Sequence, residues 1–507
     1  MTRTIQSVRI SLVGLALGAG VGGHALGDDI SVPGDYFTIA AAVVNASDGD
    51  RIILAGQTYF ENLVVNKDLE FVGLGAGQTR LHGQNIGTVM TLTNGAQVTL
   101  RDLTVEFGSA LDGGGLYVNS GTIATVEDCV FENNTADDDG GAVQVNGTLI
   151  ARRTEFTLNS LDPATGGEGG AIFADSAVVV LEDCDFVQNT SRGSGGGVTF
   201  FNGTSIDLDR CVFSGNATGS GGSAGALYAR PGTSGTVTDT DFLSNTAGSN
   251  GGAVYHDEAP VRYERCEFLD NSTGGPNGND GGAVWATGET TAEMEFVNCL
   301  FARNVAASSG GALYLSTGTD AKVLNCTIID NQSLGVTGGA ADGGAIFTTG
   351  TNAGTFIRNC LVRGNTPNQF DADGNGVEYS NVQGGWPGAG NVDLPVTLAD
   401  RAGGDYRLVE GSFSIDAGNT SLWANTGTGI VNPTDDNPVD LDGNPRVLND
   451  AGTSDTGRNT LGLAVDHGCY EFQPEPAPEC PADINNDGIL DNGDIGAFVQ
   501  LFLAGCP

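Results

Sequence analysis

One repeated unit dominates the chain between residues 113 and 365. Eight copies begin with a glycine pair that runs into a short apolar stretch, as in Gly140-Gly141-Ala142-Val143, and a degenerate ninth copy reads Ala224-Gly225-Ala226-Leu227. The second glycines of the nine copies lie 26 to 33 residues apart, at positions 114, 141, 170, 196, 225, 252, 282, 311 and 344. A unit of this length cannot bury its apolar face alone, so successive copies must stack on one another. The sequence therefore predicts a solenoid.

The residues of each unit favour strands over helices. Apolar residues recur at every second position, as at Cys211 and Phe213 or Cys266 and Phe268, and this period of two is typical of strands. A coil of ~27 residues holds about three short strands and three turns, each strand pairing ~4.8 Å above its counterpart. The turns require positive φ, which explains 80 glycines among 507 residues. We predict an all-β, right-handed parallel β-helix of the pectate-lyase-like kind with about 11–13 coils.

A second motif, in which Asn follows an apolar residue by three positions, repeats in step with the glycines. The phenylalanines should fill the core, and we expect the asparagines to be αL turn residues whose amides hydrogen-bond to the next coil. The pairs begin with Phe131 and Asn134 and continue through Phe156/Asn159, Phe186/Asn189, Phe213/Asn216, Phe242/Asn245, Phe268/Asn271 and Phe301/Asn304.

The combined glycine and Phe-x-x-Asn pattern resembles the repeat of polymorphic outer membrane proteins, which are β-helical, adhesin-like surface proteins. The resemblance covers about half of the chain. It implies a secreted or cell-surface location, associated with the outer membrane, and a carbohydrate or cell-surface ligand. Fold alone does not define function, so the role has to be argued from the surface.

The N-terminal part reads as an export signal followed by a cap. Residues 1–27 carry arginines before an apolar run at 10–21 and small residues near Gly27, the pattern of a cleaved signal peptide. No other stretch is long and apolar enough to span a bilayer. Residues 28–399 are predicted to form the β-helix, and 30–90 resemble the opening of pectate-lyase-like β-helices. Thr38 can N-cap a helix whose Ile39, Val43 and Ala46 shield the open end of the stack.

The repeat stops before residue 400. The segments 414–418, 440–446 and 465–471 together look like a choice-of-anchor Q domain, with His467-Gly468-Cys469 where that domain usually has Ile-Gly-Ala. This resemblance implies that 400–473 forms the final rungs and cap. Residues 474–479 form a short, stiff, Pro-rich linker.

Residues 480–507 are predicted to be a small calcium-loop and helix module. The loop offers oxygen ligands at the spacing of a calcium site, with Gly488 at the turn and a backbone carbonyl at the seventh position. It resembles the single-loop GC-type dockerin of exported bacterial proteins, which implies attachment through the C-terminus by surface-anchoring or sorting machinery. Export would allow a disulfide between Cys480 and Cys506. The predicted calcium ligands are Asp483, Asn485, Asp487, Ile489, Asp491 and Asp494.

Two further columns follow from the repeat. Because Phe lies two positions later and faces inward, the cysteines should form a buried ladder rather than a metal site. The residue before each cysteine position should point outward, and its charge alternates from Asp128 to Arg265, which predicts an ion ladder. The cysteines are Cys129, Cys184, Cys211, Cys266, Cys299, Cys326 and Cys360. The outward column is Asp102, Asp128, Arg153, Asp183, Arg210, Asp239, Arg265, Asn298, Asn325 and Asn359.

Charge restricts the partners. The formal net charge is −41, with only two lysines, so the surface should repel nucleic acid and anionic lipid. The alternative to a structural or adhesin-like role is a polysaccharide lyase or glycoside hydrolase acting on polyuronides. Its candidate residues are the acidic run 137–139 with Arg152, and Asp207 and Asp209 near Arg230. The long interruptions at 158–168, 271–280 and 333–342 lack basic or aromatic residues, which favours the non-catalytic role.

Overall fold

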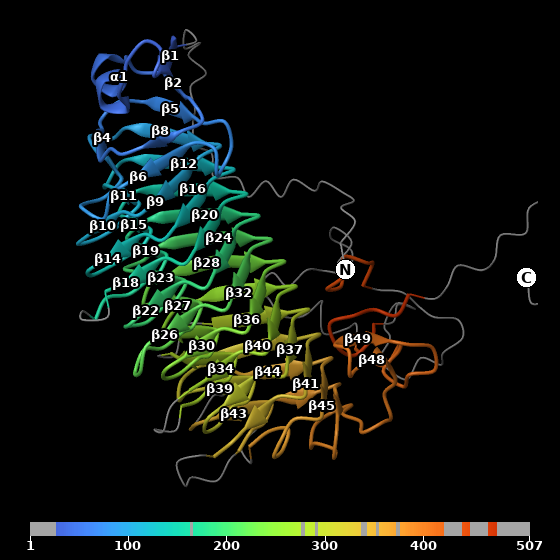
Figure 1. The fold of residues 1–507 in the computed structure, drawn as a ribbon. Helices are drawn as coiled ribbons and strands as arrows, with labels where there is room; N and C mark the ends of the chain where they lie inside the picture. The colour runs from blue at the N-terminus through green and yellow to red at the C-terminus, as the bar shows by residue number, and fades with distance from the viewer. Residues whose placement is uncertain are drawn as a thin grey trace, which may run out of the picture.

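The computed structural model describes residues 27–162, 166–274, 279–288, 293–335, 342–350, 354–371, 376–419, 439–446 and 465–473. Parallel strands stack into one long solenoid that runs from the helix α1 (Ile39–Asn45) at one end to β45 (Leu361–Arg363) near the other (Figure 1). The predicted parallel β-helix is therefore confirmed.

The strands form four parallel sheets, which we call A to D. Sheet A contains β1 (Asp29–Val32), β2 (Arg51–Leu54), β5 (Leu69–Val72), β8 (Gln97–Arg101), β12 (Ile123–Glu127), β16 (Thr148–Arg152), β20 (Val178–Glu182), β24 (Ser205–Asp209), β28 (Ser234–Thr238), β32 (Val261–Glu264), β36 (Glu293–Val297), β40 (Asp320–Leu324), β44 (Phe356–Arg358) and β46 (Val377–Glu378). Sheet B contains β3 (Thr58–Tyr59), β6 (Arg80–His82), β9 (Thr104–Glu106), β13 (Val130–Glu132), β17 (Glu155–Thr157), β21 (Asp185–Val187), β25 (Val212–Ser214), β29 (Asp241–Leu243), β33 (Glu267–Leu269), β37 (Leu300–Ala302), β41 (Thr327–Ile329), β45 and β47 (Asn381–Val382). Sheet C contains β4 (Leu63–Val65), β7 (Met90–Leu92), β11 (Leu116–Val118), β15 (Val143–Val145), β19 (Ile172–Asp175), β23 (Val198–Phe201), β27 (Leu227–Ala229), β31 (Val254–Asp257), β35 (Val284–Thr287), β39 (Leu313–Leu315) and β43 (Ile346–Thr348). Sheet D contains β10 (Ser109–Ala110), β14 (Thr135–Ala136), β18 (Ser160–Leu161), β22 (Thr190–Ser191), β26 (Ala217–Thr218), β30 (Thr246–Ala247), β34 (Ser272–Thr273), β38 (Val305–Ala306) and β42 (Gln332–Ser333).

Each central coil passes through sheets C, A, B and D in that order. The prediction of about three strands missed sheet D, because its strands are only two residues long and leave no periodic pattern. The glycine pair opens sheet C at a point where coils approach closely. A Cβ on Gly170 would lie 2.1 Å from the carbonyl oxygen of Gly196 in the next coil, so only glycine fits there.

The predicted core columns are confirmed. The phenylalanine rings from Phe131 to Phe301 are fully buried and stack with centroids 4.5 to 5.2 Å apart. The seven cysteines of the ladder are buried and free, and burial raises the pKa of the Cys129 thiol to about 12.

The asparagine column hydrogen-bonds from coil to coil as predicted, but its backbone differs from the prediction. The Nδ2 of each asparagine from Asn134 to Asn331 donates to the Oδ1 of the next, at 2.9 to 3.1 Å. The αL residue is the one before it, such as Leu158 (φ 56°) or Gln188 (φ 53°). The chain turns at that preceding residue, which faces solvent, and this leaves the asparagine free to point into the core.

The N-terminal cap has the predicted form. The Thr38 side chain accepts a hydrogen bond from Ala41 N and N-caps α1, which buries Ile39 and Val43 against the first coil, and Ala46 is buried just beyond it. Lys67 Nζ donates to the carbonyls of Val43 and Val44 in the last turn of this helix and to that of the C-cap residue Ala46 at 2.6 Å. The helix therefore covers the open end of the stack.

The described parts of residues 398–473 lie along the side of the solenoid. The antiparallel pair β48 (Leu398–Asp400) and β49 (Asp405–Leu408) lies beside β37 and β41 (Figure 1). A second apolar core forms there between Leu300, Ala302 and Ile329 of sheet B and Tyr406, Leu441, Cys469 and Tyr470 of this segment. This placement differs from the predicted terminal rungs, because the outward side chains of sheet B turn apolar at β37 and draw the segment onto that face.

Candidate functional site

The arginines at the corner between sheets A and B form the predicted ion ladder. Arg153 pairs with Asp128, Arg210 with Asp183 and Arg265 with Asp239, each at 2.8 to 2.9 Å. The column ends differently from the prediction, because Asn298, Asn325 and Asn359 are buried, and Asn298 and Asn359 hydrogen-bond to the C-terminal segment. For example, Asn298 Nδ2 donates to Val439 O at 2.9 Å. Since the arginines are tied to carboxylates, this column stabilises the stack and offers no free base.

The two candidate catalytic groupings from the sequence do not assemble. Arg152 extends from sheet A and pairs with Glu127 and Glu182, whereas the acidic run 137–139 lies between sheets D and C. Asp207 accepts a hydrogen bond from Thr236 Oγ1 at 3.1 Å, and Asp209 accepts one from Thr238 Oγ1 at 2.8 Å. Arg230, which was expected near them, pairs with a different carboxylate.

The partner of Arg230 is Glu168, 62 residues earlier in the chain. Arg230 Nη1 lies 3.1 Å from Glu168 Oε2, and its guanidinium lies over the rings of Phe201 (4.6 Å) and Tyr228 (5.4 Å). Burial raises the pKa of Glu168 to about 7 despite the opposing effect of Arg230. Arg230 thus bridges coils on the outer face of sheet C.

An acidic column lies at the edge between sheets D and C. Asp139 Oδ1 accepts a hydrogen bond from Glu168 N at 2.9 Å, and burial raises the pKa of Asp139 to about 6. The carboxylates of Asp112, Asp138 and Asp139 lie within 4.8 Å of one another, the one such group among the described residues that could hold a metal ion. The same column continues in later coils, where Asp280 Oδ1 accepts from Ser309 N at 3.0 Å. Its acids therefore have a structural role as acceptors for the next coil.

An aromatic row on the outer face of sheet C was missed by the sequence analysis. In-register pairing places one side chain per coil directly above the last, at the position that follows the glycine-pair motif. The ring centroids of consecutive residues are 4.2 to 5.9 Å apart. The signal was present, because aromatic residues recur at this one repeat position. The uninterrupted part of the row is Tyr228, Tyr255, Trp285, Tyr314 and Phe347.

Short polar side chains flank this row. Asp257 and Thr287 lie two positions after Tyr255 and Trp285 on the same strands, and Asp280 precedes the glycine pair of the coil that carries Trp285. Burial is the main cause of the raised pKa of Asp257 and Asp280. The face therefore combines one buried ring, that of Tyr228, and four half-buried rings with acidic and hydroxyl groups.

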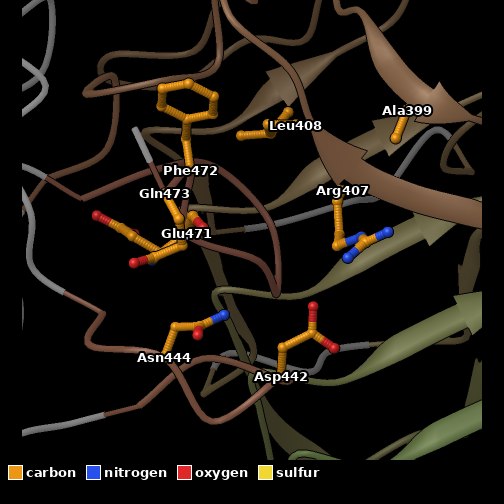
Figure 2. A pocket seen from close by; sticks show the side chains of 8 residues that line it. All are labelled: Ala399, Arg407, Leu408, Asp442, Asn444, Glu471, Phe472 and Gln473. Carbon is orange, nitrogen blue, oxygen red and sulfur yellow. Dashed lines mark hydrogen bonds between the residues drawn. The ribbon is translucent and has the colours of Figure 1, made fainter. Parts of the chain in front are cut away.

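A small cleft of about 230 Å³ lies in the C-terminal segment (Figure 2). Its guanidinium, from Arg407, is already paired with Asp405. Asn444, on its opposite side, donates its backbone N–H to Asp440 Oδ1 at 2.7 Å. The cleft is lined by Ala399, Arg407, Leu408, Asp442, Asn444, Glu471, Phe472 and Gln473. These polar groups hold the segment together, so we assign the cleft no chemistry.

Several predicted features lie outside the described residues. They include the signal peptide apart from Gly27, the linker, and the entire 480–507 module with its calcium ligands and the Cys480–Cys506 disulfide. Among the residues that the structure describes, no helix has the length and apolar character needed to cross a membrane.

Comparisons with known proteins agree with the fold and with the repeat resemblance. The family of the right-handed β-helix region matches residues 88–308. The probable outer membrane protein PmpG of Chlamydia muridarum (strain MoPn / Nigg) is 30% identical over 280 residues, which is 52% of this chain and 24% of that protein. The probable outer membrane protein pmp7 of Chlamydia pneumoniae is 29% identical over 239 residues, 44% of this chain and 24% of that protein. The chain thus spans about a quarter of the length of these relatives.

Among solved structures, a PL6-family alginate lyase is similar with a TM-score of 0.39 and 13% identity, over 73% of this chain and 54% of that one. The catalytic unit of a GH87 α-1,3-glucanase from Streptomyces thermodiastaticus strain HF3-3 is similar with a TM-score of 0.35 and 15% identity, over 66% of this chain and 68% of that one. Similarity at these values carries no conclusion about the activity of this chain.

Proposed function

We propose that this protein is an adhesin-like β-helical binding protein displayed outside the cell, which does not cleave its ligand. The observation that carries the proposal is the regularity of the outer faces. Both arginines that could serve as a base, Arg152 and Arg230, are held by carboxylates in ion pairs. An exterior built from coil-to-coil ladders suits a rigid binding surface better than a reactive centre.

Two further points support display at a surface. The relatives that match the repeats are described as probable outer membrane proteins. The C-terminal segment packs on sheet B, so a module at 480–507 would attach the solenoid from that side. Attachment there would leave sheet C facing outward, with calcium ordering the anchoring loop.

One observation favours a second candidate function, cleavage of a polysaccharide such as a polyuronide. Asp139 and Glu168 are adjacent carboxyl groups whose pKa values burial raises to about 6 and about 7. A carboxylic acid that stays protonated near neutral pH can act as a general acid in glycoside hydrolysis. The hydrogen bond between these residues and the Arg230 pairing of Glu168 compete with that role.

The test has two parts. Antibody labelling of intact producing cells should detect the full chain, and a variant that ends at residue 473 should be released into the medium. The purified full chain should generate neither unsaturated nor reducing sugar ends from a polyuronate panel, with or without calcium. Labelling only after the cells are broken would refute display. Release of sugar ends that disappears in Glu168→Gln would establish the enzyme instead.

A further inference from the structure

The aromatic row on sheet C has three polar tips without a partner among the described residues, while the hydroxyl of Tyr314 bonds to Thr349. The faces of these rings contact one another by stacking, as for Tyr255 and Trp285, whose centroids lie 4.2 Å apart at an interplanar angle of 18°. This stacking does not account for the hydroxyls of Tyr228 and Tyr255 or the indole N–H of Trp285, which have no hydrogen-bond partner among the described residues. Tyrosine and tryptophan rings with a free polar tip are suited to a ligand that is itself both apolar and polar.

The charges around the row restrict that ligand further. Asp257 and Asp280 lie near the rings, since their charges act on the titration of Tyr255 and Tyr314 respectively. The one arginine beside the row, Arg230, is neutralised by Glu168. With no unpaired cation on this face in the described part of the chain, a polyanion would be repelled. The flanking carboxylate and hydroxyl groups can instead accept and donate hydrogen bonds to an uncharged ligand.

The spacing of the row indicates the shape of the ligand. One ring occurs in each coil, so the rings repeat at ~4.8 Å along the solenoid axis over five consecutive coils. A compact molecule would cover only one or two of them. A ligand that uses the whole row must be extended, with hydroxyl-bearing units along its length.

We propose that Tyr228, Tyr255, Trp285 and Tyr314 form a binding surface for an uncharged polysaccharide chain that lies along the solenoid axis. This inference rests on the proposed binding function and names the class of its ligand. The ligand contacts the outer ring edges, while its hydroxyls bond to the free tips of Tyr255 and Trp285 and to Asp257 and Thr287.

The test uses the full chain with soluble probes: β-1,3-glucan, xylan and galactomannan as neutral polysaccharides, and alginate and polygalacturonate as anionic ones. Affinity electrophoresis and tryptophan fluorescence report binding. We expect at least one neutral probe to bind and the anionic probes not to bind. Trp285→Ala should weaken that binding about tenfold, or about 1.4 kcal/mol. The matched control is Phe356→Ala, which removes an outward, half-buried ring from sheet A.

Tyr255→Phe keeps the ring and removes only the hydroxyl, and Trp285→Phe keeps an aromatic ring but removes the indole N–H with part of the bicycle, so both test the row even where the alanine variant fails to fold. Each should weaken binding about threefold, and Trp285→Phe should remove the fluorescence change. The inference is overturned by silence across the neutral probes, by equal binding of the anionic probes, or by unchanged affinity in these variants. The inference is also overturned if a protein binds to this row and none of the glycan probes does. Surface labelling and sugar-end release test the proposed function separately.

Discussion

Replacement of Asn216 by alanine tests the asparagine ladder that joins the coils. The Asn216 side chain is fully buried and makes four hydrogen bonds. Its Oδ1 accepts from Asn189 N and Asn189 Nδ2, both at 3.0 Å, and its Nδ2 donates to Phe186 O at 2.8 Å and Asn245 Oδ1 at 3.0 Å. At about 1 kcal/mol net for each bond, the loss is about 4 kcal/mol. The largest single part is the Asn189 backbone N–H, which is left buried without an acceptor.

The local assay is hydrogen exchange at the Asn189 amide in a peptide-resolved mass measurement. This amide should exchange about 10- to 100-fold faster in the variant, which corresponds to an opening free energy lower by about 1–3 kcal/mol. Urea unfolding followed by circular dichroism gives the global value. The control is Asn62→Ala, which removes one exposed hydrogen bond, from Asn62 Nδ2 to Thr88 O at 2.9 Å, and should change stability by about 0.5 kcal/mol.

Equal effects of the two substitutions would refute the reasoning. The same conclusion would follow from unchanged protection of the Asn189 amide, since the hydrogen bond to Asn216 Oδ1 would then contribute nothing. A repeat stack transmits a defect mainly to its neighbours, so coils near β4 should keep their protection in the Asn216 variant.

Three other predictions concern a carboxyl group, a glycine and the C-terminal loop. Glu168 has its pKa raised from 4.5 to about 7, so its protonated form favours folding; its contribution is complete below about pH 4.5 and is lost as the pH rises through about 7. Glu168→Gln should therefore flatten the pH dependence of urea midpoints across that interval, and an unchanged slope would contradict the assignment. Gly252→Ala places a Cβ 2.0 Å from Gly282 O and should lower thermal stability by about 3 kcal/mol or more, whereas Gly274→Ala, with its nearest contact at 3.8 Å, should be near neutral. Calorimetry of the full chain should show a calcium site that Asp487→Ala abolishes, and retained binding would place the ion elsewhere, the group at Asp139 included.

The fold was largely predictable because the repeat shows the residue type of each inward position in many copies. Eight glycine pairs, one degenerate copy and a column of Phe-x-x-Asn pairs indicated the coil length and the core residues without any knowledge of the turns. The asparagine backbone was not predictable in the same way, since the residue at the αL corner varies between Leu158, Gln188 and Ser244 and only its φ angle is shared.

The candidate site was predicted poorly for a different reason. Arg230 and Glu168 come together from coils far apart in the chain, and sequence proximity instead suggested Asp207 and Asp209. The aromatic position was visible in the repeat, but the sequence alone does not show that its side chains face outward while those one position earlier, such as Val284, are buried.

Two outward faces of this solenoid, on sheets B and C, contain large apolar side chains, and only the face on sheet B is covered by another described segment of the chain. On sheet B, Leu300 and Ile329 are covered by Tyr406 and Leu441 of the C-terminal segment, and the hydroxyl of Thr327, beside Leu300, accepts a hydrogen bond from Cys469 N of the same segment at 3.1 Å. On sheet C, no described segment takes that place, and the hydroxyls of Tyr228 and Tyr255 and the indole N–H of Trp285 have no partner among the described residues. The chain itself therefore satisfies the polar side chain on sheet B, whereas the tips of Tyr255 and Trp285 on sheet C have no partner among the described residues. The contrast between the two faces therefore favours an external, hydroxyl-rich ligand on sheet C over simple stabilisation of the stack.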